Sequence, residues 1–327
     1  MSDDGEHIHY LNLAKIPPGS IGKFWMHIVN NAIGEPIRVP IMVARGIKEG
    51  PILGLTAAIH GNELNGISVI QELFRNLNPR ELTGTIIGVL VVNVPGLLRE
   101  QRGFINHEDL NRITPGKADG NVGQVYIYRI IDRILRNFDL HIDLHTASFG
   151  RRNSYYIRAD MDEPRTARMA RLQNADIIVH NPANDQTLRG AADGLHIPSI
   201  TVELRDPHLF QDGVVEDSLV GINNVIYDFG MLPGQPVCPA VPTLLCRRSY
   251  WLYTDEGGIL EVLPRVRHRV KKGELVARVS TIFGKITKTW NAPEDGVIVG
   301  RSVNPLNQTG SRIVHLGVDI EEVTCVV

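Results

Sequence analysis

Short apolar runs alternate with longer amphipathic segments from about residue 39 to residue 231 of the chain. Several runs are apolar at successive positions, as in strands that helices cover on both faces. The segments between them repeat apolar residues every three or four positions, which predicts helices. This alternation indicates a layered α/β domain with a mainly parallel sheet. The predicted strands cover residues 39–44, 52–59, 85–92, 138–144, 177–179 and 197–204, and the predicted helices cover 64–77, 124–137 and 164–174.

The pattern changes after Met231. A linker-like passage contains Pro233, Pro236, Pro239 and Pro242, and beyond it the helical periodicity ends. Short β-like pieces then alternate with glycine turns, which predicts a small all-β domain. We therefore expect an α/β domain over residues 1–235 and an all-β domain over residues 240–327.

The composition argues against nucleic-acid-binding and membrane proteins. Of the 327 residues 43% are hydrophobic and 21% are charged, as in ordinary globular proteins. The formal net charge of -2 gives no broad electrostatic reason to expect binding to nucleic acid or to an anionic membrane. No apolar run approaches the roughly 20 residues of a membrane span.

The cysteines and the N-terminal residues indicate the cellular compartment of the protein. The chain has three cysteines, Cys238, Cys246 and Cys325, which is an odd number, and none of them is in a CxxC motif. A disulfide framework is therefore not expected, and the cysteines are interpreted as buried small hydrophobic residues. The first ten residues are acidic and polar, unlike a signal peptide. These features together favour a cytoplasmic protein.

A candidate metal site follows two of the predicted strands. His60 and Glu63 lie where the run 52–59 gives way to a predicted helix, and His145 ends the run 138–144. Because the carboxyl ends of parallel strands meet at one edge of a sheet, the three side chains can converge there. Two histidines, one glutamate and a water form a typical catalytic zinc set. An isolated HxxE pair would more often be a surface pair, so the hypothesis depends on the combination.

Residues 141, 143 and 145 share one face of their predicted strand. Asp143 is therefore well placed to orient a ligand histidine, although the sequence does not tell which ring nitrogen it meets. His141 points the same way and is a rival ligand.

Glu203 lies inside an otherwise apolar strand, where an ionised carboxylate is costly without a partner. Near a metal site it could take a proton from a water and deliver it to a leaving nitrogen. The alternative is an edge-strand glutamate paired with Arg205, and the segment alone favours neither.

Polar side chains that could bind an anion lie in two stretches of this domain. They are Arg99, Arg102, Asn111 and Arg112, and Arg151, Arg152 and Asn153 follow the proposed metal ligand. A guanidinium can hold a substrate carboxylate or stabilise the oxyanion that forms when water attacks a carbonyl. Taken singly, Arg99, Arg102 and Arg112 are better explained as solvated loop residues, whereas Arg151, Arg152 and Asn153 are equally well explained as surface residues.

Five motifs in order make the sequence similar to the succinylglutamate desuccinylase and aspartoacylase family, relatives of the zinc carboxypeptidases. They span most of residues 50 to 210 and are His60-Gly61-Asn62-Glu63, Asn93-Val94-Pro95-Gly96, Asp109-Leu110-Asn111-Arg112, Asp143-Leu144-His145-Thr146 and Thr201-Val202-Glu203.

The resemblance implies a three-layer, zinc-carboxypeptidase-like α/β domain with a mainly parallel mixed sheet, followed by a β domain like biotinyl or lipoyl carriers. It implies that one Zn²⁺ per chain is bound by His60, Glu63 and His145, and that Glu203 is the general base and proton shuttle. Further roles follow by resemblance: Arg102, or Arg99 in its place, polarises the carbonyl, Asn111 and Arg112 hold a substrate carboxylate, and Arg189 is a further substrate-binding residue.

The leading hypothesis is a zinc-dependent deacylase that cleaves the amide bond of a small anionic N-acyl amino acid. A carboxypeptidase acting on a peptide or glutamyl chain would use the same groups. A third hypothesis, a carrier or binding module, needs a modifiable lysine in the tail. Lys272 and Lys285 lie beside turn glycines, but the biotinyl Met-Lys-Met context is absent. The tail is expected to shield the active-site mouth or to form a contact in a homo-oligomer.

Overall fold

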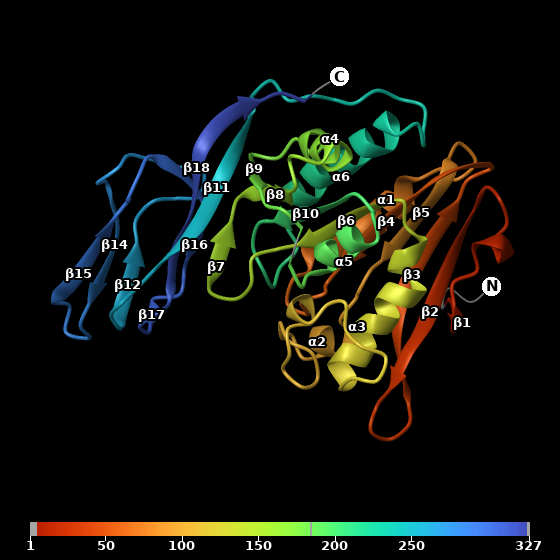
Figure 1. Ribbon diagram of the computed structural model, residues 1–327, viewed down its shortest axis with the longest axis horizontal. Coiled ribbons are helices and arrows are strands. Elements are labelled where there is room, and N and C mark those ends of the chain that lie inside the picture. The colour runs from red at the N-terminus through yellow and green to blue at the C-terminus, as the bar shows by residue number, and fades with distance from the viewer. Residues whose placement is uncertain (1–4, 184, 326–327) are drawn as a thin grey trace.

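The apolar runs of the sequence lie side by side in one large mixed sheet (Figure 1). The computed structural model describes residues 5–183 and 185–325. Within these ranges the sheet has 14 strands in the order β1-β2-β3-β5-β4-β6-β10-β8-β9-β11-β18-β16-β13, and β7 pairs with β16. The α/β class with a mixed sheet is thereby confirmed. Its strands are β1 (Glu6–Ile8), β2 (Ser20–Asn30), β3 (Pro36–Arg45), β4 (Lys48–Ala57), β5 (Thr83–Val89), β6 (Leu140–His145), β7 (Arg151–Asn153), β8 (Tyr155–Ala159), β9 (Ile177–His180), β10 (Ser199–Leu204), β11 (Thr243–Tyr253), β13 (Arg269–Val270), β16 (Gly296–Ser302) and β18 (Arg312–Val323).

Helices cover the two faces of this sheet. One buried cluster packs α1, α4 and α6 against the sheet, and another packs α3 and α5 against its opposite face. The helix α3 begins with a capping box, in which Asn121 and Gln124 satisfy each other's free backbone N–H groups. No helix in the described ranges is long and apolar enough to cross a membrane. The helices are α1 (Asn65–Asn76), α2 (Val94–Leu98), α3 (Val122–Arg133), α4 (Pro164–Leu172), α5 (Leu188–Gly194) and α6 (Asp212–Asp228), with short 3₁₀ turns η1 (Leu13–Lys15), η2 (Leu110–Arg112) and η3 (Leu135–Asn137).

The strand order brings the candidate site together. The strands β4, β6 and β10 are adjacent and parallel, so their carboxyl ends lie at the same edge. Thr56 of β4 pairs with Asp143 of β6, and Glu203 of β10 pairs with His145 of β6. A site that is distributed over 144 residues of sequence, from His60 to Glu203, therefore gathers at one end of three neighbouring strands.

The C-terminal segment is β-structured and continues the same sheet. The strand β11 pairs in parallel with β9, and β18, β16 and β13 follow it. A second sheet has the order β15-β14-β12-β17 and lies at the opposite end of the molecule from β1 to β3 (Figure 1). Its strands are β12 (Gly258–Val262), β14 (Leu275–Ser280), β15 (Ile286–Asn291) and β17 (Leu306–Asn307). Lys272 follows β13, and Lys285 lies in the turn between β14 and β15.

The cysteine interpretation was wrong for two of the three residues. Cys238 and Cys325 form a disulfide with their Cα atoms 5.4 Å apart, whereas Cys246 is free and buried. No local pattern signals this pairing, because 87 residues separate the two cysteines. The disulfide also removes cysteine usage as an argument for a reducing compartment.

Candidate active site

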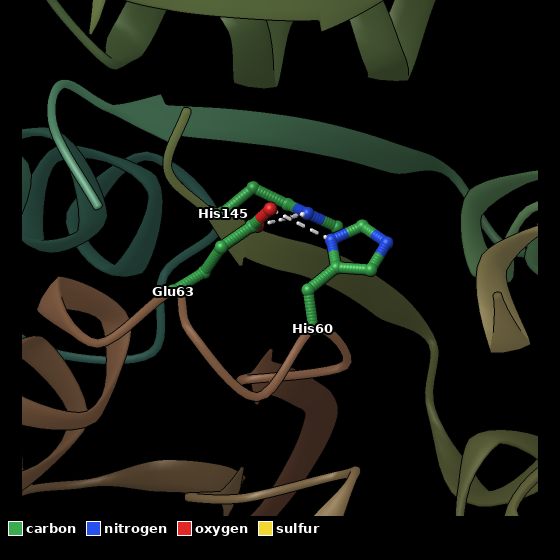
Figure 2. Close-up of side chains that lie close together, drawn as sticks. All are labelled: His60, Glu63 and His145. Atoms are coloured by element: carbon green, nitrogen blue, oxygen red, sulfur yellow. Dashed lines mark hydrogen bonds and ion pairs between the residues drawn. The ribbon is translucent and has the colours of Figure 1, made fainter. Parts of the chain in front are cut away.

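His60, Glu63 and His145 form a buried cluster at the carboxyl ends of β4 and β6 (Figure 2). The Nδ1 atoms of His60 and His145 each lie 2.9 Å from a different oxygen of the Glu63 carboxylate. The three side chains are only 2–4% exposed. One ligand atom from each lies within 4.8 Å of the others, as a single metal ion requires.

Carboxylates also lie beside the Nε2 atoms of both histidines, which are the ring nitrogens that do not face Glu63. Asp143 Oδ2 lies 2.8 Å from His145 Nε2, and Asp109 Oδ1 lies 3.1 Å from His60 Nε2. Such partners fix the ring orientation and tautomer of metal-binding histidines. The sequence indicated Asp143 from strand alternation, but it missed Asp109, which reaches His60 from a loop across 49 residues.

His141 does not join the cluster. Its Nε2 lies 2.8 Å from Thr56 Oγ1, and its Nδ1 lies 2.8 Å from Ser199 Oγ. Both ring nitrogens are therefore occupied, and His141 is no longer a rival ligand. Burial lowers the pKa of His141 to about 4, although Asp143 opposes this shift.

The chemistry of the cluster fits a divalent cation. Burial would raise the pKa of Glu63, but His60 and His145 hold it well below its ordinary value. Burial would lower the pKa of His145, but Asp143 and Glu63 raise it well above its ordinary value, so a metal ion at this nitrogen would take the place of a proton. His60 Nδ1 is buried without a hydrogen bond in the described part of the chain, although Glu63 is close. Two imidazole nitrogens and one carboxylate form a donor set that suits zinc.

Glu203 faces the same cavity from the central strand β10. Asn153 Nδ2 donates to its Oε2 at 3.0 Å, and Arg158 Nε lies 3.7 Å from its Oε1. It is neither on an edge strand nor paired with Arg205, which instead lies 3.5 Å from Asp217. The alternative structural interpretation of Glu203 is therefore wrong.

Arg102 reaches the cluster, and Arg99 does not. Arg102 Nη1 donates to Glu63 Oε1 at 3.1 Å and to Ser148 Oγ at 2.5 Å. Its Nε and Nη2 lie 3.0 and 2.9 Å from Asp109 Oδ2, so one carboxylate positions both Arg102 and His60. Arg99 is exposed, donates to the carbonyl of Ile105 and does not line the cavity.

The other proposed substrate-binding residues all line the cavity. Arg112 is exposed, and Asn111 Oδ1 accepts a hydrogen bond from the backbone N–H of Leu188 at 2.7 Å. Arg189 is 2% exposed and donates to the carbonyl and side-chain oxygens of Asn181, each at 2.7 Å. Arg189 thus holds the loop before α5 in addition to facing the cavity.

The cavity has a volume of about 380 Å³, within the range of small-ligand sites. Its wall includes Arg151 and Asn153, which the sequence had marked as candidates, and also Ser148, Tyr156 and Arg158, which no sequence pattern had marked. Sequence patterns also missed Trp251 and Arg312, which the C-terminal segment contributes. No local pattern marks these two residues, because they enter the cavity only through the pairing of β11 with β9 and β18.

A mixed α/β sheet with a cavity over its carboxyl edge, centred on a cluster able to hold a metal, defines a candidate metal-dependent enzyme. Residues 49–227 match the succinylglutamate desuccinylase/aspartoacylase catalytic domain, and the chain belongs to that family.

Similarity to individual relatives covers from 39% to 96% of the chain. The N-alpha-acetyl-L-2,4-diaminobutyric acid deacetylase of Halomonas elongata is 24% identical over an alignment 295 positions long that covers 81% of this chain and 81% of that protein. The succinylglutamate desuccinylase of Pseudomonas paraeruginosa is 31% identical over an alignment 139 positions long that covers 39% of this chain and 42% of that protein. The fold is shared with a succinylglutamate desuccinylase/aspartoacylase from Rhodobacter sphaeroides, with a TM-score of 0.83 and 21% identity over 96% of this chain and 98% of the other.

Proposed function

We propose that the protein is a zinc-dependent amidohydrolase that removes the acyl group from a small anionic N-acyl amino acid. The observation that carries this proposal is the convergence of His60, Glu63 and His145 beside Glu203 on one arginine-lined cavity. The names of two relatives, a deacetylase of an N-acetyl amino acid and a desuccinylase, support the same reaction type.

The protein's own groups are arranged for proton transfer and charge stabilisation. Zinc held by His60, Glu63 and His145 would supply Lewis-acid polarisation of the amide carbonyl and acidify a water. Glu203, in register with His145, would take the proton of that water and later deliver it to the leaving nitrogen. Arg102, held by Asp109 beside Glu63, would donate to the developing oxyanion.

The substrate carboxylate would be held by Asn111 and Arg112 at the cavity wall, with Arg189 supporting the same side. Arg112 is exposed and presents its guanidinium to an entering anion, whereas the groups of Arg189 are bonded to Asn181. Arg99 has no place in this proposal because it does not line the cavity.

The test is a turnover assay of the zinc-loaded protein on N-acetyl and N-succinyl amino acids beside C-terminal dipeptides, with release of free amine as the readout. Preferred release from the N-acyl amino acids supports the deacylase, and preferred release from dipeptides supports a carboxypeptidase instead. Absence of turnover across both substrate classes would contradict the proposed activity. A tail lysine carrying a lipoyl or biotinyl group, visible as added intact mass, would support the carrier hypothesis.

A further inference from the structure

Five buried polar side chains form a row across the sheet beneath the candidate metal site. The row begins at Ser199 of β10, passes through His141 of β6 and Thr56 of β4, returns to Asp143 of β6 and ends at His145. Each of these residues is only 0–4% exposed. Ser199, His141 and Thr56 do not line the cavity, so a substrate bound there does not contact them.

The register of three central strands brings the row together. Thr56 of β4 is the direct neighbour of Asp143, and Ser199 of β10 is the direct neighbour of His141. In-register side chains of adjacent parallel strands lie on the same face of a sheet, and strand alternation puts residues 141, 143 and 145 on one face. The row therefore follows directly from the strand pairing.

A polar row is costly in the middle of a sheet. On the opposite face of β6, Leu140, Ile142 and Leu144 belong to the apolar cluster that includes residues of α1 and α6. Buried polar groups cost free energy unless each is hydrogen-bonded, and apolar side chains of similar shape would be about as stable. Packing alone therefore does not require this row, and its last member is a proposed metal ligand.

The direction of the hydrogen bonds in the row can be assigned. Thr56 Oγ1 donates its single proton to Asp143 Oδ1 at 2.6 Å. It must then accept from His141 Nε2, which lies 2.8 Å away. A neutral imidazole carries one N–H, so His141 Nδ1 accepts from the Ser199 hydroxyl at 2.8 Å. Burial lowers the pKa of His141 to about 4, which keeps the ring neutral near neutral pH.

All of these hydrogen bonds run toward Asp143. Its Oδ1 accepts from Thr56, which leaves Oδ2 to face His145 Nε2 at 2.8 Å. No lysine or arginine of the described residues lies within ion-pairing distance of this carboxylate. A hydroxyl that accepts a hydrogen bond becomes a stronger donor, so His141 strengthens the bond by which Thr56 fixes Asp143.

The other histidine of the cluster is held in a different way. Its partner Asp109 has a side chain that is 25% exposed, and a guanidinium, that of Arg102, fixes the Asp109 carboxylate. Asp143 has a neutral hydroxyl in place of that cation. The polar row therefore acts on His145 and leaves His60 to the loop.

We propose that Thr56 and His141, supported by Ser199, are positioning residues for the metal site, which fix the Asp143 carboxylate so that His145 keeps its Nε2 proton and presents Nδ1 to the metal. The row thereby raises the affinity for zinc without contacting the ion or the substrate. This inference rests on the proposed function, in which His145 binds zinc.

The first test removes the hydroxyl of Thr56. Thr56→Val keeps the shape of the side chain but cannot donate, so the zinc affinity should fall by roughly 10- to 100-fold, the loss typical when a partner behind a metal-binding histidine is removed. Thr56→Ser keeps the donor and should stay within about threefold of the wild type. Competition with a chelator on the folded protein measures these affinities without turnover.

Thr243→Val is the matched control. Thr243 of β11 is also buried, donates its hydroxyl to the carbonyl of Ala175 at 2.8 Å and does not line the cavity. Its replacement removes a buried hydrogen bond of the same kind far along the sheet, so it should lower the free energy of unfolding but leave the zinc affinity unchanged.

The second test reads the proton positions in the wild-type protein and needs no substitution. Nitrogen-15 NMR of the histidine rings distinguishes a protonated ring nitrogen from an unprotonated one. His141 should be protonated at Nε2 and unprotonated at Nδ1 near neutral pH, both with and without zinc.

Each result decides a different point. Wild-type zinc affinity in Thr56→Val would overturn the proposal, and so would equal losses in Thr56→Val and Thr56→Ser, which would indicate a packing effect. A proton on His141 Nδ1 would also overturn it, even if Thr56→Val did not fold. Wild-type protein that binds no zinc would contradict the proposed function, whereas the protonation of His141 would still decide the direction of the row.

Discussion

The imidazoles of His60 and His145 share one arrangement in which the inner Nδ1 faces Glu63 and the outer Nε2 faces an aspartate. Asp109 serves His60 from a loop, and Asp143 serves His145 from the same strand. A proton shared on each outer nitrogen leaves the two inner nitrogens free to act as metal ligands. Since Asp109 also anchors Arg102, this one loop residue couples the metal ligands to the proposed oxyanion donor.

His315 provides a residue-scale prediction about pH. It is 2% exposed, its Nδ1 has no hydrogen bond within the described residues, and burial lowers its pKa well below the ordinary value, with Arg158 and Arg312 adding to the shift. The unfolded chain binds a proton at this residue near pH 6.5, whereas the folded chain does not. The free energy of unfolding should therefore fall as pH drops below about 6.5, by up to about 1.4 kcal/mol per pH unit from this group.

Urea unfolding between about pH 7.5 and about pH 5.5 measures this slope. His315→Gln removes the titrating group, so its free energy of unfolding should depend on pH less steeply than that of the wild type, even if the variant is less stable overall. His196→Gln, at an exposed position, is the control. Equal slopes for the wild type and His315→Gln would contradict the prediction.

At the scale of elements, two of the sequence motifs turn out to be one structural unit. The segment that carries His60 and Glu63 packs directly on the backbone of α2, where a Cβ on Gly61 would lie 2.0 Å from the carbonyl carbon of Gly96. Asn93 fastens this contact, because its Oδ1 accepts from the N–H of Gly96 and its Nδ2 donates to the carbonyl of Ile59. The segment 93–96 thus supports the loop of residues 60–63, which carries two of the proposed metal ligands.

Gly61→Ala should displace this loop. The added methyl group meets backbone atoms that cannot move as a flexible side chain would, so we expect a destabilisation of about 1–3 kcal/mol, together with weaker zinc binding. Chemical denaturation and competition with a chelator measure the two effects. Gly213→Ala is the control, because a Cβ there meets nothing within 4 Å. Wild-type zinc affinity in Gly61→Ala would contradict this account of the loop.

The apolar periodicity of the sequence predicted strands and helices whose side-chain pattern is contained within the element itself. The predicted strand 39–44 lies within β3, and the predicted helix 64–77 corresponds to α1. The three candidate ligands could be predicted because each lies at, or shortly after, the carboxyl end of a strand. Asp109, Trp251 and Arg312 could not, since their positions depend on long-range packing that no local periodicity records.

At the scale of the whole molecule, the C-terminal segment is part of the catalytic architecture. The strand β11 continues the large sheet at β9, and a buried cluster at this junction includes Tyr156, Val179, Cys246 and Val299. The division into residues 1–235 and 240–327 remains a prediction about folding units, but the sheet and this cluster cross it.

Residues 1–235 expressed alone should therefore fail to form a stable domain. Truncation leaves the β9 edge unpaired and exposes the apolar residues of the junction, which favours aggregation. Size-exclusion chromatography and thermal unfolding measure the outcome. A soluble, monomeric fragment with a cooperative transition like that of the full chain would contradict the prediction.

The central claim is that His60, Glu63 and His145 hold the metal while Glu203 transfers the proton. Its most direct test is the zinc content and amine-release rate of Glu203→Gln and His145→Ala, measured side by side on the same preferred N-acyl amino acid. We predict that Glu203→Gln keeps wild-type zinc and loses roughly 10²- to 10⁴-fold in kcat, whereas His145→Ala loses both. A Glu203→Gln enzyme with a near-normal rate would contradict the account.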